Sequence, residues 1–148
     1  MNRHLLICTG LLATALTAFI GSTLAAAAPA APERLRVPKG FQIEVLTDAV
    51  PNARGMTLGR FTGDRGVVYV GTMREGKLYA VELDGGRALK VHTLASGLTL
   101  PTGVAYRNGS LFVSAVSRIL RFDGIDERLV NPPAPTVVTC LFINIRHK

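Results

Sequence analysis

The feature that most constrains this chain is an internal repeat made of short apolar segments. Two stretches, residues 46–78 and 94–119, carry the same residue types in the same order, and their offset falls from 48 to 41 residues. The matched positions are Leu46 with Leu94, Val50 with Leu98, Gly55 with Gly103, Met56 with Val104, Tyr69-Val70-Gly71 with Phe112-Val113-Ser114, and Lys77-Leu78 with Arg118-Ile119. A unit of forty-odd residues with four short strands is typical of a propeller blade.

Segments with strand character follow one another from residue 40 onward. Residues 41–45 alternate apolar and polar side chains, which is the period of a half-buried strand. The Asn108-Gly109 pair predicts a hairpin, because both residues tolerate positive φ. Further β-type runs are residues 67–70, 78–81, 89–91, 103–105, 111–113 and 119–122. No helical stripe appears past residue 40, so we predict an all-β fold: an incomplete β-propeller of about two blades, or a generic β-meander.

Four segments are expected along the chain. Residues 1–28 have the basic start, apolar run and small residues of a secretory signal peptide; an uncleaved anchor is the alternative. Residues 29–39 are proline-rich and are expected to form a linker. Residues 40–138 are expected to form the blades, and residues 139–148 a divergent tail of the kind that a frameshift or premature stop would produce. The signal predicts a periplasmic or secreted protein with no membrane span after cleavage.

Composition argues against two classes of function. The formal net charge is +7 at pH 7, but the sequence does not interleave aromatic and basic residues. This combination argues against a nucleic-acid-binding protein. No second long apolar run follows the expected signal, which argues against a protein with several membrane spans.

An ordered set of motifs covers residues 37–138. They are Pro38-Lys39-Gly40-Phe41-Gln42-Ile43-Glu44-Val45, Val50-Pro51-Asn52-Ala53-Arg54, Val70-Gly71-Thr72, Gly76-Lys77-Leu78-Tyr79-Ala80, Leu94-Ala95-Ser96-Gly97-Leu98, Leu100-Pro101-Thr102-Gly103-Val104-Ala105, Val116-Ser117-Arg118-Ile119-Leu120-Arg121-Phe122 and Asn131-Pro132-Pro133-Ala134-Pro135. In this order they resemble the sorbosone dehydrogenase-like family. The resemblance implies a periplasmic six-bladed propeller that oxidises sugars or aldehydes. It implies pyrroloquinoline quinone as cofactor, commonly with calcium nearby, and hydride transfer assisted by a general base, typically histidine.

Arg54 is the candidate cofactor-binding residue. It follows a Pro-Asn turn and precedes the strand that would edge the central channel, where its cation could meet a cofactor carboxylate. The alternative is an exposed arginine in a turn. Asp123, Asp126 and Glu127 are expected to form a solvated loop, because they lack the alternating oxygen ligands of a dedicated calcium loop. The sequence assigns no catalytic and no metal-binding residue.

The histidines do not supply the expected base. The residues around His147 do not fit the family, His4 lies in the expected signal, and His92 is expected to be half-exposed on a strand. We therefore expect the truncated N-terminal part of a quinone-dependent dehydrogenase, inactive on its own and binding neither quinone nor calcium.

Two other functions remain open from the sequence. The chain could be a non-catalytic repeat module that binds a protein partner through the strand edges that two blades leave open. It could also be a fragment of a gluconolactonase-like hydrolase with a metal in the channel, against which the Arg118-Ile119-Leu120-Arg121 and Asn131-Pro132-Pro133 motifs argue. Residues 136–145 are uncharged and rich in β-formers, which predicts self-association through edge strands.

Overall fold

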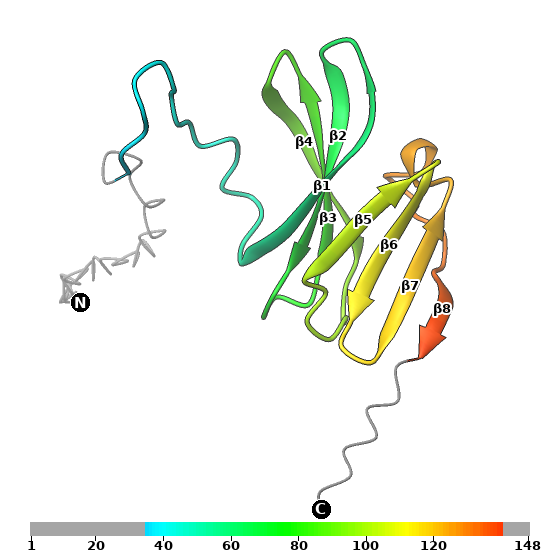
Figure 1. Cartoon of the computed structure of the whole chain (residues 1–148). Coiled ribbons are helices and arrows are strands. Elements are labelled where there is room, and N and C mark those ends of the chain that lie inside the picture. The colour runs from blue at the N-terminus through cyan, green and yellow to red at the C-terminus, as the bar shows by residue number, and fades with distance from the viewer. Residues whose placement is uncertain (1–34, 141–148) are drawn as a thin grey trace, which may run out of the picture. The chain divides into compact units, whose positions relative to one another are not determined.

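The computed structural model describes residues 35–140, so the expected signal peptide and most of the expected tail lie outside the described residues. The chain divides into two units, Met1–Ala30 and Ala31–Lys148, and the described residues belong to the second. This unit is all-β, as predicted, and consists of two four-stranded antiparallel sheets (Figure 1). The strands are β1 (Ala53–Thr62), β2 (Arg65–Thr72), β3 (Leu78–Asp84), β4 (Arg87–Ala95), β5 (Gly103–Arg107), β6 (Ser110–Ala115), β7 (Arg118–Asp123) and β8 (Thr136–Cys140).

Each sheet is a meander, because its strands pair in sequence order: β1-β2-β3-β4 in the first sheet and β5-β6-β7-β8 in the second. The β5–β6 hairpin turns at Asn108 and Gly109, which have φ angles of 50° and 78°. Two positive φ angles match the twist of the flanking strands, so the Asn-Gly hairpin prediction is confirmed. A short 3-10 helix, η2 (Ile125–Glu127), follows β7.

The pairing register of the two sheets reproduces the internal repeat. Gly55 lies opposite Gly71 in the first sheet, and the aligned Gly103 lies opposite Ser114 in the second. The neighbouring residue pairs correspond in the same way. Met56 pairs with Val70 and Gly71 with Leu78 in the first sheet, and the aligned Val104 pairs with Val113 and Ser114 with Ile119 in the second. Because the side-chain period of a strand is two, this shared register places aligned residues on corresponding faces of the two sheets.

The strand predicted at residues 41–45 is absent from the structure. This segment has no regular secondary structure, and Phe41, Ile43 and Val45 are exposed at 69%, 42% and 51%. An alternating pattern forms a strand only when a neighbouring strand satisfies its backbone groups. The described residues provide no such neighbour for this segment.

The last strand was not expected from the sequence. β8 pairs with β7, with Thr136 opposite Arg121 and Cys140 opposite Arg118. It runs through the expected boundary between blades and tail at residues 138 and 139. The second sheet thereby gains its fourth strand from residues that sequence analysis assigned partly to the tail.

The two sheets pack through one apolar cluster that includes residues of both. Its buried members are Tyr69, Leu78, Ala80, Leu94, Leu111, Val113, Ala115, Leu120, Phe122, Ile125 and Leu129. Two glycines allow the segment before β5 to approach the first sheet closely. A Cβ atom at Gly55 would lie 2.1 Å from the Thr102 carbonyl oxygen, and one at Gly71 would lie 2.2 Å from the Pro101 carbonyl oxygen.

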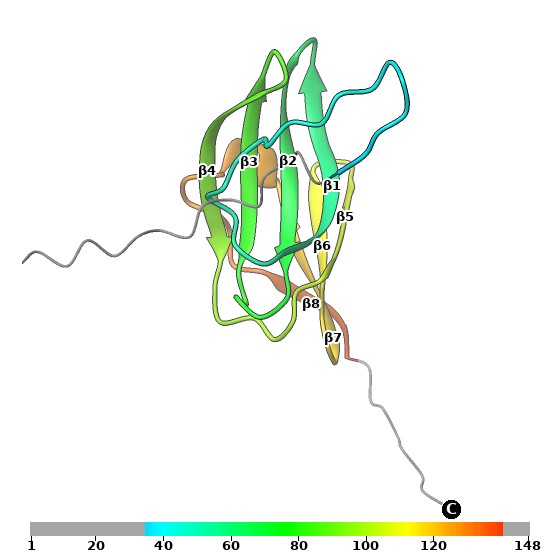
Figure 2. The same cartoon turned by 90° about the vertical axis from the view of Figure 1, so that its left-hand side faces the viewer.

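The other face of the β1–β4 sheet carries a smaller apolar cluster, formed by Val68, Val70, Tyr79 and Val81. Val50 packs against this cluster, and Figure 2 shows the segment before β1 passing in front of the sheet. Met56 and Leu58 lie on the same face of β1 and remain exposed, at 70% and 65%. Within residues 35–140, no helix is long and apolar enough to cross a membrane.

Candidate functional site

The connecting segments of both sheets meet at the end where β1 and β5 begin. They are the β2–β3 loop, the β4–β5 connection and the β6–β7 hairpin. A pocket at this end, which we call the end pocket, is lined by Met73, Leu100, Thr102, Ser114 and Val116. The end pocket therefore draws residues from three connections and from β6.

Two residues of the end pocket have strained backbones. Leu100 and Val116 have φ angles of 46° and 47°, a region that favours glycine. For a β-branched residue such as Val116 this conformation is a genuine outlier. Such strain costs on the order of 1–3 kcal/mol per residue and is concentrated at functional sites. Its occurrence at two residues of one pocket singles out this end of the molecule.

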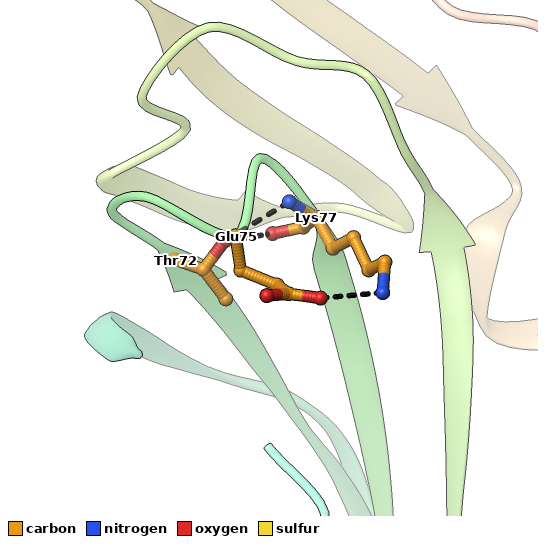
Figure 3. Close-up of polar contacts among 3 residues, drawn as sticks. All are labelled: Thr72, Glu75 and Lys77. Atoms are coloured by element: carbon orange, nitrogen blue, oxygen red, sulfur yellow. Dashed lines mark hydrogen bonds and ion pairs between the residues drawn. The ribbon is translucent and has the colours of Figure 1, made fainter. Parts of the chain in front are cut away.

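The wall of the end pocket is held by a well-ordered loop between β2 and β3 (Figure 3). The hydroxyl of the buried Thr72 donates to the Lys77 carbonyl oxygen at 2.7 Å and accepts from the Lys77 backbone N–H at 3.0 Å. The Leu98 backbone N–H donates to the Gly76 carbonyl oxygen at 2.9 Å, which ties the loop to the β4–β5 connection. These bonds hold the loop that contains Met73 against the end of β2 and the β4–β5 connection.

The same loop contains an ion pair. Lys77 Nζ and Glu75 Oε1 are 2.5 Å apart, and the hydrogen bond between them raises the pKa of Lys77 above its usual value. Glu75 is therefore neutralised by a neighbour within its own loop (Figure 3). Because Glu75 is already paired with Lys77, it does not neutralise the arginines nearby.

Arg54, the candidate cofactor-binding residue, lies at this end of the molecule, just before Gly55 of β1. It sits at the irregularity between Ala53 and Gly55 at the start of β1, and it is exposed. The backbone carbonyl of Asn52, two residues before Arg54, accepts a hydrogen bond from the Met73 N–H at 3.1 Å. Arg54 thus flanks the end pocket but does not line it. Two more exposed arginines lie at this end, Arg74 in the β2–β3 loop and Arg118 at the start of β7, and residues 35–140 contain no ion-pair partner for any of the three.

A second polar cluster joins β2, β5 and η2. Asp126 of η2 accepts a 2.7 Å hydrogen bond from the Tyr69 hydroxyl and another from the Tyr106 hydroxyl. The rings of Tyr69 and Tyr106 are stacked, with centroids 5.7 Å apart. The prediction of a solvated loop is therefore wrong for Asp126, whose side chain is only 9% exposed. Arg60 Nε lies 3.7 Å from its second oxygen.

This cluster, which we call the tyrosine–aspartate bridge, changes the acidity of both tyrosines. Burial is the largest cause of the raised pKa values of Tyr69 and Tyr106, and the neighbouring Asp126 carboxylate adds to it. Both phenols are therefore neutral donors at physiological pH. Such groups are suited to hold η2 against both sheets.

His92 does not have the position expected from the sequence. It is buried, at 8% exposure, and its Nε2 lies 2.5 Å from Glu82 Oε1. The prediction of a half-exposed surface histidine is wrong, because the His92 side chain lies on the face of β4 that is turned toward the second sheet. There the carboxylate of Glu82 satisfies the ring nitrogen.

The described part of the chain contains no group of three or more His, Cys, Asp or Glu side chains that could hold a metal ion. His4 and His147 lie outside the described residues. The end pocket was not predicted from the sequence. The local feature that could have indicated it is Val116, a valine in a tight turn between two short strands, but such a turn looks like an ordinary hairpin in the pattern of residue types.

Comparison with curated proteins identifies a relative of part of this chain. The chain is 28% identical over 114 residues to an uncharacterized protein of Borreliella burgdorferi. The match covers 76% of this chain and 28% of the relative, so the chain spans little more than a quarter of the relative's length. No family model matches the chain, and no solved structure matches it.

Proposed function

We propose that this chain forms the first two blades of a larger β-propeller that oxidises sugars or aldehydes with pyrroloquinoline quinone. Two consecutive four-stranded meanders with one shared register support the blade architecture. The ordered motifs at residues 37–138 support the sorbosone dehydrogenase-like family. The length of the Borreliella relative, of which this chain matches 28%, agrees with a larger protein.

One observation carries the proposed site: the strained residues Leu100 and Val116 line the same pocket at the end where Arg54 lies. A planar quinone that carries several carboxylates needs apolar walls and nearby cations. Leu100, Val116 and Met73 supply apolar surface, and the three arginines at this end supply cations. These residues fit one side of the cofactor. In the proposed enzyme the quinone would accept the two electrons of the substrate C–H bond.

The described residues do not fit the rest of the reaction. His92 is buried in its pair with Glu82, away from the end pocket, and residues 35–140 offer no ligand set for calcium. The base and any metal would therefore come from other parts of the propeller. For this chain alone we propose weak quinone binding without turnover. This goes beyond the sequence-based expectation of no binding, because the two sheets already form the end pocket.

The proposal is tested by titrating pyrroloquinoline quinone into the purified chain and measuring binding by calorimetry. We expect saturable binding that the Arg54→Gln substitution weakens about tenfold, since a charge-assisted hydrogen bond contributes on the order of 1.5–3 kcal/mol. The matched control is Arg87→Gln, which removes an exposed arginine at the start of β4, at the opposite end of the sheet. It should leave the affinity unchanged.

Two outcomes would count against the proposal. If the chain does not bind quinone, or if Arg54→Gln and Arg87→Gln weaken quinone binding equally, the proposed site is wrong. Either result would favour the non-catalytic repeat module. Turnover of aldoses or aldehydes by this chain with quinone, calcium and a dye acceptor would show that residues of the chain supply the base. The DNA that follows codon 138 gives an independent check, because a reading frame that encodes further blades is expected there.

A further inference from the structure

The interface between the two sheets has two different sides. On the first sheet, Tyr69 projects from a surface kept flat by Gly55 and Gly71, against which the Pro101 and Thr102 backbone lies. On the second sheet, the opposing surface is aliphatic and aromatic, and its buried residues are Leu111, Val113, Leu120 and Phe122. We call these the flat side and the aliphatic side of the interface.

The repeat places a second flat side on the outer face of the β5–β8 sheet. Phe112 takes the position of Tyr69 there, Gly103 that of Gly55, and Ser114 that of Gly71. This face is not covered by any described segment. It forms an apolar pocket lined by Gly103, Val104, Ala105, Phe112, Val113, Ser114 and Ile119.

The repeat also places a second aliphatic side on the outer face of the β1–β4 sheet. Val68, Val70, Tyr79 and Val81 take the positions of Leu111, Val113, Leu120 and Phe122, and they form the smaller apolar cluster. Met56 takes the position of Val104 and is 70% exposed. Val50 covers only part of this face. The chain therefore carries both halves of one interface on its two outer faces.

We propose that the open face of the β5–β8 sheet binds the β1–β4 sheet of a second copy of this chain, so that copies associate head to tail. A second copy is the expected partner because its outer β1–β4 face carries residues aligned with the aliphatic side of the internal interface. Within one chain, that aliphatic side already packs against the flat side of the first sheet, which is aligned with the open face of the β5–β8 sheet. The contact is heterologous and can continue from copy to copy until a ring closes or a filament forms. The inference rests on sheet packing alone and does not depend on quinone binding.

Charge sets the expected salt dependence of this association. The contact surfaces are apolar, whereas each chain carries a formal net charge of +7. Like charges on approaching copies repel one another over distances that salt screens. Added salt should therefore strengthen the association, which is opposite to the behaviour of an interface held by ion pairs.

Sedimentation velocity on the full chain and two single variants tests the proposal. Met56→Glu places a charge on the aliphatic face, and Ala105→Glu places one on the flat face; both sites are exposed, so both variants should fold. We expect the unaltered chain to associate with rising concentration, and each variant to remain monomeric. Val130→Glu is the matched control, because Val130 is also 70% exposed and lies on neither face. It should associate as the unaltered chain does.

Mixing the two variants gives the decisive result. Each retains one intact face, so a head-to-tail interface predicts a one-to-one dimer that cannot grow further. A mixture that stays monomeric would overturn the proposal, as would an unaltered chain that is monomeric up to about 1 mM. Association that survives both substitutions would assign the contact to strand edges such as β8 and would equally overturn it. Circular dichroism of each variant checks that the fold is intact.

Discussion

The β1–β4 and β5–β8 sheets are built on one repeat but meet different surroundings. Tyr69 of the first sheet is fully buried between the sheets, whereas the aligned Phe112 of the second sheet is only half-buried. Gly71 admits no side chain beside the Pro101 carbonyl oxygen, whereas the aligned position carries Ser114. The comparison teaches that the repeat determines strand register, while the neighbour of each face determines which residue types its positions tolerate.

The largest difference between the sheets is expected at the aligned aromatic positions. Tyr69→Ala removes a fully buried ring and should lower the free energy of unfolding by about 4 kcal/mol. Phe112→Ala removes a half-buried ring, and its effect should be about 1 kcal/mol. Urea denaturation followed by circular dichroism measures both values. Equal losses would contradict the assignment of one covered and one open face.

A smaller difference is expected at the aligned small residues. Gly71→Ser forces a side chain toward the Pro101 carbonyl oxygen, where a Cβ would lie at 2.2 Å, and should cost about 2–3 kcal/mol. Ser114→Gly loses the 3.0 Å hydrogen bond from the Gly103 N–H to the serine hydroxyl and should cost about 1 kcal/mol or less. Thermal unfolding of the two variants decides the order, and the reverse order would contradict the proposed contact.

The tyrosine–aspartate bridge has no counterpart on Phe112, which lacks a hydroxyl. Tyr69→Phe keeps the ring but removes the donor to Asp126, and should cost about 2 kcal/mol because the acceptor is charged. Asp126→Asn tests the same bond from the other side. A double-mutant cycle should show that the two losses are not additive. Additive losses would mean that the two side chains do not interact.

The smallest expected effect is a loss of stability at alkaline pH, caused by ionisation of Tyr69 and Tyr106 at the contact between the sheets. Tyrosine ionises near pH 10 in an unfolded chain, and burial raises the pKa of Tyr69 and Tyr106 in the folded protein. Because the folded pKa exceeds the unfolded one, this stabilisation is full below about pH 10 and is lost as the pH rises toward the folded value. Denaturation at increasing pH should show a falling free energy of unfolding, with a shallower fall in Tyr69→Phe. An identical slope would contradict the role of the bridge.

Much of the fold could be predicted from the sequence because it depends on local signals. The apolar runs predicted β2 to β7, and Asn108-Gly109 predicted its hairpin. Residues 41–45 show the limit, because they alternate apolar and polar side chains but pair with no described strand. β8 was missed because the predicted boundary between blades and divergent tail, at residues 138 and 139, falls inside it, although its residues complete the second sheet.

The candidate site was less predictable, because it depends on contacts between distant segments. Arg54 was selected from the turn that precedes it, and the structure places it at the start of β1, exposed; its role in cofactor binding stays a prediction. The roles of Asp126 and His92 could not be inferred, since their partners lie on other strands. The strain at Leu100 and Val116 arises from tertiary packing and leaves no mark in the pattern of residue types.

The most direct test of the account compares two aligned positions on the two flat sides. Thr57 lies opposite Tyr69, and Ala105 lies opposite Phe112, so cysteines at these sites report the covered and the open face. The two native cysteines, Cys8 and Cys140, would be replaced by serine in both variants. At low protein concentration, the cysteine at position 105 should react with a thiol reagent as a free thiol does, and the cysteine at position 57 should react far more slowly. Equal rates at the two positions would contradict the claim that one repeat presents one covered and one open face.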